Sequence, residues 1–86
     1  MKKNYTKQEI LEIMDPLMPK ALELVMEKQR VSVALIQKEF TINYPRAARI
    51  VDQMEEFGFI ESETIKTRKI LIKNEQYKDL FEEQND

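Results

Sequence analysis

The chain has 86 residues, of which 14 are basic and 16 acidic, and it contains no cysteine and no histidine. This length suits one small domain, and the two missing residue types exclude disulfides and the usual zinc ligands. No apolar run approaches the roughly 20 residues needed to cross a bilayer, and the first residues lack the apolar region of a signal peptide. We therefore expect a cytoplasmic protein with no membrane association.

The net charge of −2 hides a split along the chain. Residues 74–86 hold five acidic side chains and one basic side chain, which gives this segment −4. Residues 1–73 hold 13 basic and 11 acidic side chains and therefore carry +2. Local fields steer partners more than net charge does, so this split matters for binding. We therefore treat the chain as an N-terminal extension (1–14), a weakly basic domain predicted to bind DNA (15–73) and an acidic C-terminal tail (74–86).

The first predicted element is a short helix over residues 6–14. Thr6 and Glu9 have the spacing of a capping box. Asp15 precedes Pro16, and the residue before a proline is disfavoured in the helical region. The pattern therefore predicts an interruption at this point.

A longer helix is predicted from about Pro16 to Lys28. Asp15 suits its N-cap position, and proline suits the first helical position. Apolar residues cover much of its circumference, so this helix should lie at the centre of the core. Residues 29–31 then predict a short extended segment.

The next two helices are separated by a tight turn. Ser32 is the predicted cap of a helix over 33–40, and Asn43 is the predicted cap of a third helix over 44–57. Gly58, the only glycine, lies where a left-handed helix terminator is expected.

Beyond this glycine the pattern becomes strand-like. Residues 59–61 and 68–72 are rich in β-branched and aromatic types, with a polar turn over 62–67, and a last short helix is predicted near 77–81. The expected fold is α+β and mostly α. It is a winged helix-turn-helix, with a three-helix core, a β-hairpin wing, and short extra N- and C-terminal helical segments.

The predicted helix over 44–57 carries polar side chains suited to reading DNA. At about 100° per residue, Arg46, Arg49 and Gln53 fall within roughly 60° of one another, opposite the apolar face. Arginine forms two hydrogen bonds with guanine in the major groove, and glutamine does so with adenine. These three are the main candidate DNA-reading residues. The alternative is a solvated helix face on which Arg49 pairs with Asp52.

Further candidate DNA contacts lie outside this face. Three basic side chains belong to the predicted hairpin: Lys66, Arg68 and Lys69. They suit phosphate contact, although lysines also protect edge strands from aggregation. Gln37 and Lys38 would clamp the DNA backbone or simply form an exposed helix face. Tyr44 would pack on the turn, the interpretation we favour, or face the sugar-phosphate.

Catalysis has no support in the sequence. No histidine or cysteine is available, no serine lies in a catalytic constellation, and a single glycine excludes a Walker A loop. We therefore expect no enzyme activity and no cofactor.

One motif in the chain is specific enough to compare with a known family. It reads Tyr-x-Arg-Ala-Ala-Arg followed by Asp-Gln, and it belongs to a set of matching stretches: 21–25, 31–32, 35–37, Tyr44, 46–50, 52–55, Gly58, Lys66, Arg68 and 71–72. Through these stretches, residues 15–72 resemble the gamma domain of the FtsK/SpoIIIE DNA translocases. The resemblance implies a winged helix that reads short, G-rich, polar DNA sequences, directs a translocase towards the chromosome dimer-resolution site and touches the site-specific recombinase. It implies DNA contacts by Arg46, Arg49, Gln53, Lys66 and Arg68.

Three positions depart from the family pattern. Pro45 replaces an asparagine and makes no bidentate base contact, Asn43 replaces a glycine, and Lys69 replaces an acidic residue and adds phosphate affinity. The motor is missing from the sequence, so we expect a small accessory protein of a phage or other mobile element.

We consider three hypotheses. The first is a non-catalytic DNA-binding protein, with duplex DNA favoured and single-stranded DNA as the alternative. The second is an adaptor for a recombinase, polymerase or helicase, motivated by the acidic tail and the apolar Ile10, Leu11 and Met14. The third is a transcriptional repressor, which dimerisation would support because repressor half-sites are commonly paired.

Overall fold

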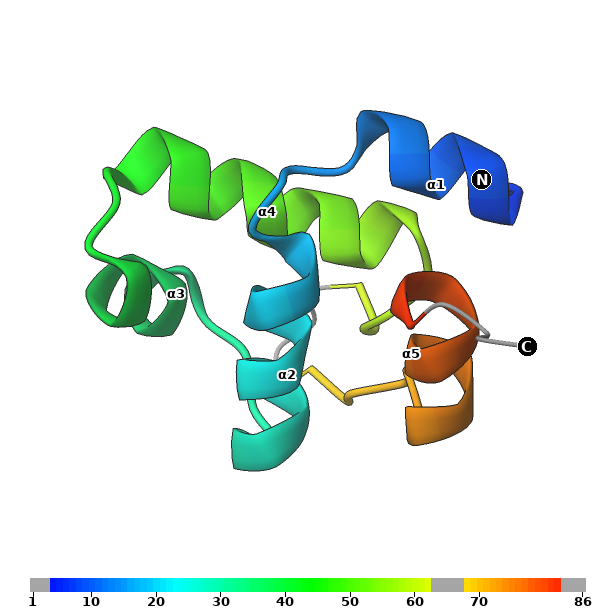
Figure 1. Cartoon of the computed structure of the whole chain (residues 1–86). Helices are drawn as coiled ribbons and strands as arrows, with labels where there is room; N and C mark the ends of the chain where they lie inside the picture. The colour runs from blue at the N-terminus through cyan, green and yellow to red at the C-terminus, as the bar shows by residue number, and fades with distance from the viewer. Residues whose placement is uncertain (1–3, 63–67, 83–86) are drawn as a thin grey trace.

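The chain forms five helices over the residues that the computed structural model describes, 4–62 and 68–82. In chain order they are α1 (Lys7–Ile13), α2 (Met18–Lys28), α3 (Val33–Phe40), α4 (Tyr44–Glu56) and α5 (Asn74–Phe81). In Figure 1, α3 and α5 lie on opposite sides of α2, and α1 runs beside the C-terminal half of α4. None of the helices described is long and apolar enough to span a membrane.

Short-range capping signals set the helix boundaries as predicted. Thr6 and Glu9 close a capping box, in which each side chain accepts the backbone N–H of the other residue. The side chains of Ser32 and Asn43 each accept the N–H of the third residue that follows, at 3.0 and 2.9 Å. Gly58 follows α4 with a φ of 83°. These four predictions are confirmed.

The predicted start of α2 at Pro16 is wrong by two residues. The helix begins at Met18, and its N-cap position is Leu17 rather than Asp15. The carbonyl of Asp15 accepts the N–H of Met18 at 2.8 Å, because Pro19 has no N–H to complete an α-helical bond to that carbonyl. A turn therefore precedes the first regular turn of α2.

Among the described residues, two other than glycine adopt the left-handed conformation where a helix ends. Gln29 (φ 55°) ends α2 and Thr41 (φ 53°) ends α3. The left-handed Gln29 is followed after two residues by Ser32, the N-cap of α3. Residues 29–31 form no strand. The predicted extended segment at this place is therefore wrong.

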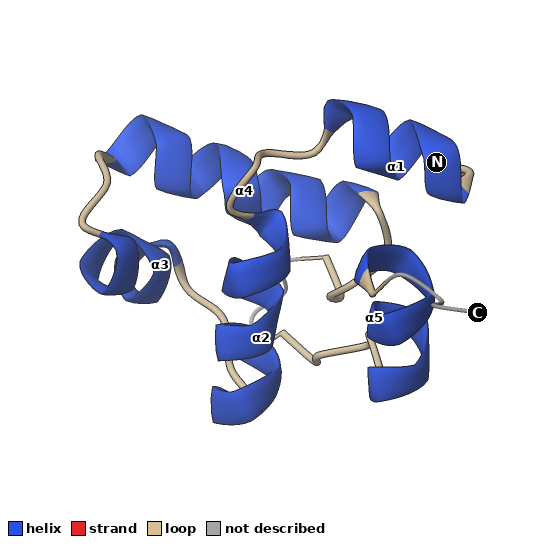
Figure 2. Cartoon of the chain, in the orientation of Figure 1, coloured by secondary structure: helices blue, strands red, loops and turns tan. Residues whose placement is uncertain are grey.

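The predicted hairpin strands, 59–61 and 68–72, reduce to one antiparallel bridge between Ile60 and Ile70. Beside it, the backbone N–H groups of the two residues after Ile70 both donate to the carbonyl of Phe59, at 2.8 and 3.0 Å. Two residues facing one is the arrangement of a β-bulge, which interrupts a ladder. Figure 2 accordingly shows no strand in the described part of the chain, and the β-hairpin wing is not confirmed.

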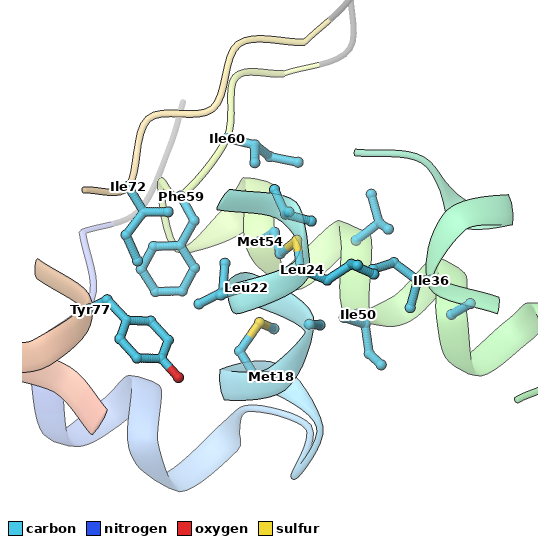
Figure 3. Close-up of a cluster of buried hydrophobic side chains, with 14 of the residues drawn as sticks. Met18, Leu22, Leu24, Ile36, Ile50, Met54, Phe59, Ile60, Ile72 and Tyr77 are labelled. Atoms are coloured by element: carbon cyan, nitrogen blue, oxygen red, sulfur yellow. The ribbon is translucent and has the colours of Figure 1, made fainter. Parts of the chain in front are cut away.

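The core lies where α2, α3 and α4 meet, and the segments around the bridge and α5 close it on one side (Figure 3). The largest fully buried side chains are Met18, Leu22, Val25, Ile36, Ile50, Met54 and Ile60. Phe59, Ile72 and Tyr77 extend this core towards α5. α2 contributes five buried residues, as its broadly apolar sequence predicts. The packing fixes α4 with one face on the core and the opposite face at the surface.

Candidate nucleic-acid interface

α4 divides into three faces. The buried face consists of Ala47, Ile50, Val51 and Met54. The exposed face, which we term the open stripe, consists of Pro45, Arg49, Asp52 and Glu56. Between the two, Arg46 and Gln53 are half-buried and lie against the segment that joins α1 to α2.

Arg49 is the cation of the open stripe. It lies in the second turn of α4 and forms no ion pair with the residues described. The predicted alternative, a pair with Asp52, is absent from this part of the chain. Asp52 and Glu56 lie further along the stripe, so cationic character is confined to the start of α4.

Arg46 is bound to Asp15. The Nε and Nη2 atoms of the guanidinium donate to the two carboxylate oxygens at 3.0 and 2.9 Å. This hydrogen bond holds the pKa of Asp15 below its usual range and raises the pKa of Arg46. Such a bidentate pair is stronger and better oriented than a single contact between exposed charges.

Gln53 holds the same segment through its backbone. Its side-chain oxygen accepts the N–H of Asp15 at 2.9 Å, and its side-chain nitrogen donates to the carbonyl of Ile13 at 3.0 Å. Both halves of the amide are therefore occupied within the molecule. In this structure Gln53 fixes the position of the α1–α2 connection against α4.

A third contact holds the N-terminal residues against the end of α4. The Tyr5 hydroxyl donates to the carboxylate of Glu56 at 2.7 Å. The Tyr5 ring also meets the Phe57 ring edge-on, with centroids 5.1 Å apart. Residues 5–15 therefore lie along one flank of α4 from its end to its first turn.

The three predicted DNA-reading residues thus have different surroundings. Arg49 faces solvent, whereas Arg46 and Gln53 are engaged by the segment before α2. Helical spacing correctly placed the three near one another, but it did not reveal what covers two of them. Asp15 was missed as part of the site. Its position before a proline indicates a cap, and no local pattern links it to a side chain 31 positions away.

Tyr44 is 60% exposed, so the favoured interpretation that it packs on the turn is wrong. It lies at the first position of α4, next to Pro45 on the open stripe. Lys38 is exposed and Gln37 half-buried, and both line a shallow depression of about 510 Å³ between α3 and the turn that follows it. Both residues lie on α3, the helix that precedes α4.

The structure describes two of the three basic residues of the predicted hairpin. Lys69 is exposed, and its backbone N–H donates to the side chain of Glu61 at 3.2 Å. Arg68 is half-buried and has interaction partners in the structure. Lys66 lies outside the described residues. The hairpin therefore contributes one described, exposed lysine to the candidate interface.

Comparison with known proteins identifies the central part of the chain. Residues 12–73 match the FtsK gamma domain family. The matched span contains α2, α3, α4 and the bridged segment, and it ends before α5.

Several curated relatives carry related sequence. The chain is 41% identical to the DNA translocase SpoIIIE of Bacillus subtilis (strain 168) over 70 residues, which are 80% of this chain and 9% of that protein. It is 42% identical to the DNA translocase FtsK of Bacillus cereus over 74 residues (85% and 9%). It is 53% identical to the DNA translocase FtsK of Lactiplantibacillus plantarum over 51 residues (58% and 6%). The chain thus spans less than a tenth of the length of these relatives.

Proposed function

The chain belongs to the FtsK gamma domain family, and from this premise we propose that it is a non-catalytic protein that binds duplex DNA with the start of α4. The exposed Arg49, in the second turn of a helix whose first position is the exposed Tyr44, carries the proposal. An arginine at this place in a helix that follows a short helix and turn suits major-groove reading.

We further propose how the domain meets DNA. The first two turns of α4 enter the major groove, because Asp52 and Glu56 on the later turns would meet the phosphates unfavourably. The segment around the Ile60–Ile70 bridge acts as the wing, with Lys69 as a phosphate contact. Lys38 on α3 supplies a second contact with the phosphate backbone of the DNA.

Fluorescence anisotropy with labelled duplex DNA and matched single-stranded DNA, over a salt series, tests this proposal. We expect duplex binding with a log–log salt slope of about −3 to −5, which corresponds to several phosphate contacts. Arg49→Gln should weaken duplex binding by about tenfold, because a bidentate arginine–base contact is worth roughly 1–3 kcal/mol.

Lys78→Gln is the matched control, since it removes one positive charge from the exposed surface of α5. It should change the affinity by less than about twofold. An equal loss of duplex affinity in both variants would show that the effect comes from net charge, and would reject docking by α4. Tighter binding to the single strand would reject duplex recognition and make single-stranded DNA the ligand.

A protein adaptor is the second candidate function. A groove of about 770 Å³ lies between α1, α2 and α5, and Leu11, Met14, Leu80 and Phe81 give it apolar walls. Leu11 is 39% exposed, whereas Ile10 is buried and unavailable to a partner. Binding of a purified site-specific recombinase from the same genome, lost in Leu11→Ser and retained in Lys78→Gln, would support this function. The expected phage origin and cytoplasmic location stay predictions.

A further inference from the structure

We propose that Asp15 is a positioning residue that keeps Arg46 out of the DNA interface and thereby sets the DNA affinity of α4 below the level that its basic residues would otherwise give. This inference rests on the proposed function, because it concerns the same surface of α4. It assigns a role to a residue in the connection between α1 and α2, outside the helix-turn-helix itself.

The carboxylate of Asp15 is fixed from several directions. It accepts two hydrogen bonds from Arg46, at 3.0 and 2.9 Å, and one from the N–H of Leu17 at 2.8 Å. The backbone N–H of Asp15 donates to Gln53 at 2.9 Å, and its carbonyl accepts the N–H of Met18 at 2.8 Å. The Asp15 side chain is only 11% exposed. It is therefore a fixed anchor, unlike an exposed carboxylate that releases its partner easily.

The anchor directs Arg46 to the side of the open stripe. At about 100° per residue, Arg46 lies roughly 90° around α4 from the middle of that stripe. Its side chain remains 40% exposed, so DNA at the stripe would meet its edge rather than its full charge. Without Asp15, the long arginine side chain would be free to reach towards Arg49 and an adjacent phosphate.

One released cation matters because the open stripe is poor in positive charge. It carries Arg49 against Asp52 and Glu56, a balance of −1. Arg46 is the nearest further cation on α4, and its bidentate pair with Asp15 makes it part of a neutral unit. Removal of the Asp15 charge changes the local balance of the DNA-facing surface without altering α4.

The test compares three proteins by the same duplex anisotropy titration. Relative to wild type, Asp15→Asn should bind duplex DNA about fivefold more tightly at low salt, and its log–log salt slope should steepen by about 1, as for one added phosphate contact. The double variant Asp15→Asn/Arg46→Gln should return to the wild-type affinity and slope within about twofold. The return would show that the gain comes from Arg46.

Asp79→Asn is the control for net charge. It also removes one negative charge, from a carboxylate on α5 whose side chain is 74% exposed and which pairs only at 3.8 Å with Lys7. We expect less than about a twofold change in affinity and no change in slope. A gain equal to that of Asp15→Asn would overturn the inference, because the effect would then be one of total charge.

Other outcomes also decide the question. Weaker binding by folded Asp15→Asn would show that Asp15 prepares Arg46 for DNA, which overturns the inference. If Asp15→Asn does not fold by circular dichroism, Asp15→Ser replaces it, because a serine oxygen still accepts the Leu17 N–H. If wild type binds duplex DNA and neither Asp15→Asn nor Asp15→Ser binds it more tightly, only this inference is rejected. If none of the proteins binds duplex DNA, the proposed function is rejected as well.

Discussion

The Tyr77 hydroxyl donates a 2.5 Å hydrogen bond to the carboxylate of Glu23, and it lies 3.2 Å from the carbonyl of Pro19. The contact joins α5 to α2 across 54 positions of sequence. Tyr77 is 8% exposed, and its ring also packs against Phe81, with centroids 5.0 Å apart. Tyr77 thus contributes a buried ring and a short polar contact to the attachment of α5, beside the partly buried Leu80 and Phe81 and the pair of Asp79 with Lys7.

Tyr77→Phe removes the hydroxyl and keeps the ring. A hydrogen bond to a charged partner contributes roughly 1.5–3 kcal/mol, and because the exposed Glu23 can rehydrate we expect a loss of about 1–2 kcal/mol in the free energy of unfolding. Urea unfolding measures it. Tyr44→Phe, at an exposed position, should stay within about 0.5 kcal/mol of wild type; equal effects of the two substitutions would contradict this account.

The same tyrosine predicts a loss of stability at alkaline pH. Burial, together with the hydrogen bond to Glu23, raises the pKa of Tyr77. Because the folded-state pKa lies above the unfolded value of about 10, the contribution is complete below about pH 10 and is lost as pH rises through the folded-state pKa. The stability difference between wild type and Tyr77→Phe should shrink above about pH 10. A difference that stays constant to pH 12 would refute this prediction.

The Asp15–Arg46 pair should make stability depend on pH in the acidic range, with loss as pH falls. The hydrogen bond from Arg46 lowers the pKa of Asp15. A carboxyl whose pKa is depressed in the folded state contributes stability above its unfolded pKa of about 4, and this is lost as pH falls through the folded-state pKa. Thermal unfolding from pH 7 to 3 should show wild type losing its advantage over Asp15→Asn below about pH 4. Parallel curves for the two proteins would argue against a stabilising pair.

Gly58 gives a prediction about backbone strain alone. Its φ is 83°, and a Cβ at this position would meet nothing within 4 Å. Gly58→Ala should therefore lower stability by about 1–2 kcal/mol, the cost of left-handed conformation for an ordinary residue. Gly58→Asn should cost less, because asparagine tolerates that conformation. Equal urea midpoints for the two variants would show that strain at this position is not the cause.

The sequence predicted those parts of the fold that depend on neighbouring residues. The caps at Thr6, Ser32 and Asn43 and the terminator at Gly58 each act within four positions, so the residue types suffice. Helical periodicity likewise identified the buried face of α4. The candidate site was predicted in the same way, and the predicted exposure of Arg49 agrees with its position at the surface of α4.

The remaining features depend on contacts between distant segments. Nothing in the pattern around Arg46 or Gln53 indicates that the connection before α2 lies against them, because their partners are separated from them by 31 to 40 positions. The predicted hairpin strands were not confirmed for another reason. Its residues have strand propensity, but the doubled donation to the Phe59 carbonyl interrupts the ladder, and propensity describes a fit to a sheet surface rather than a pairing register.

The two hydrogen bonds of Gln53 suggest how the sequence around α1 tolerates change during evolution. They end on the carbonyl of Ile13 and the N–H of Asp15, which every residue other than proline provides. Position 13 can therefore accept many side chains without loss of this attachment, whereas position 53 needs an amide that donates and accepts at once. Across related genomes, variation should therefore be greater at position 13 than at position 53.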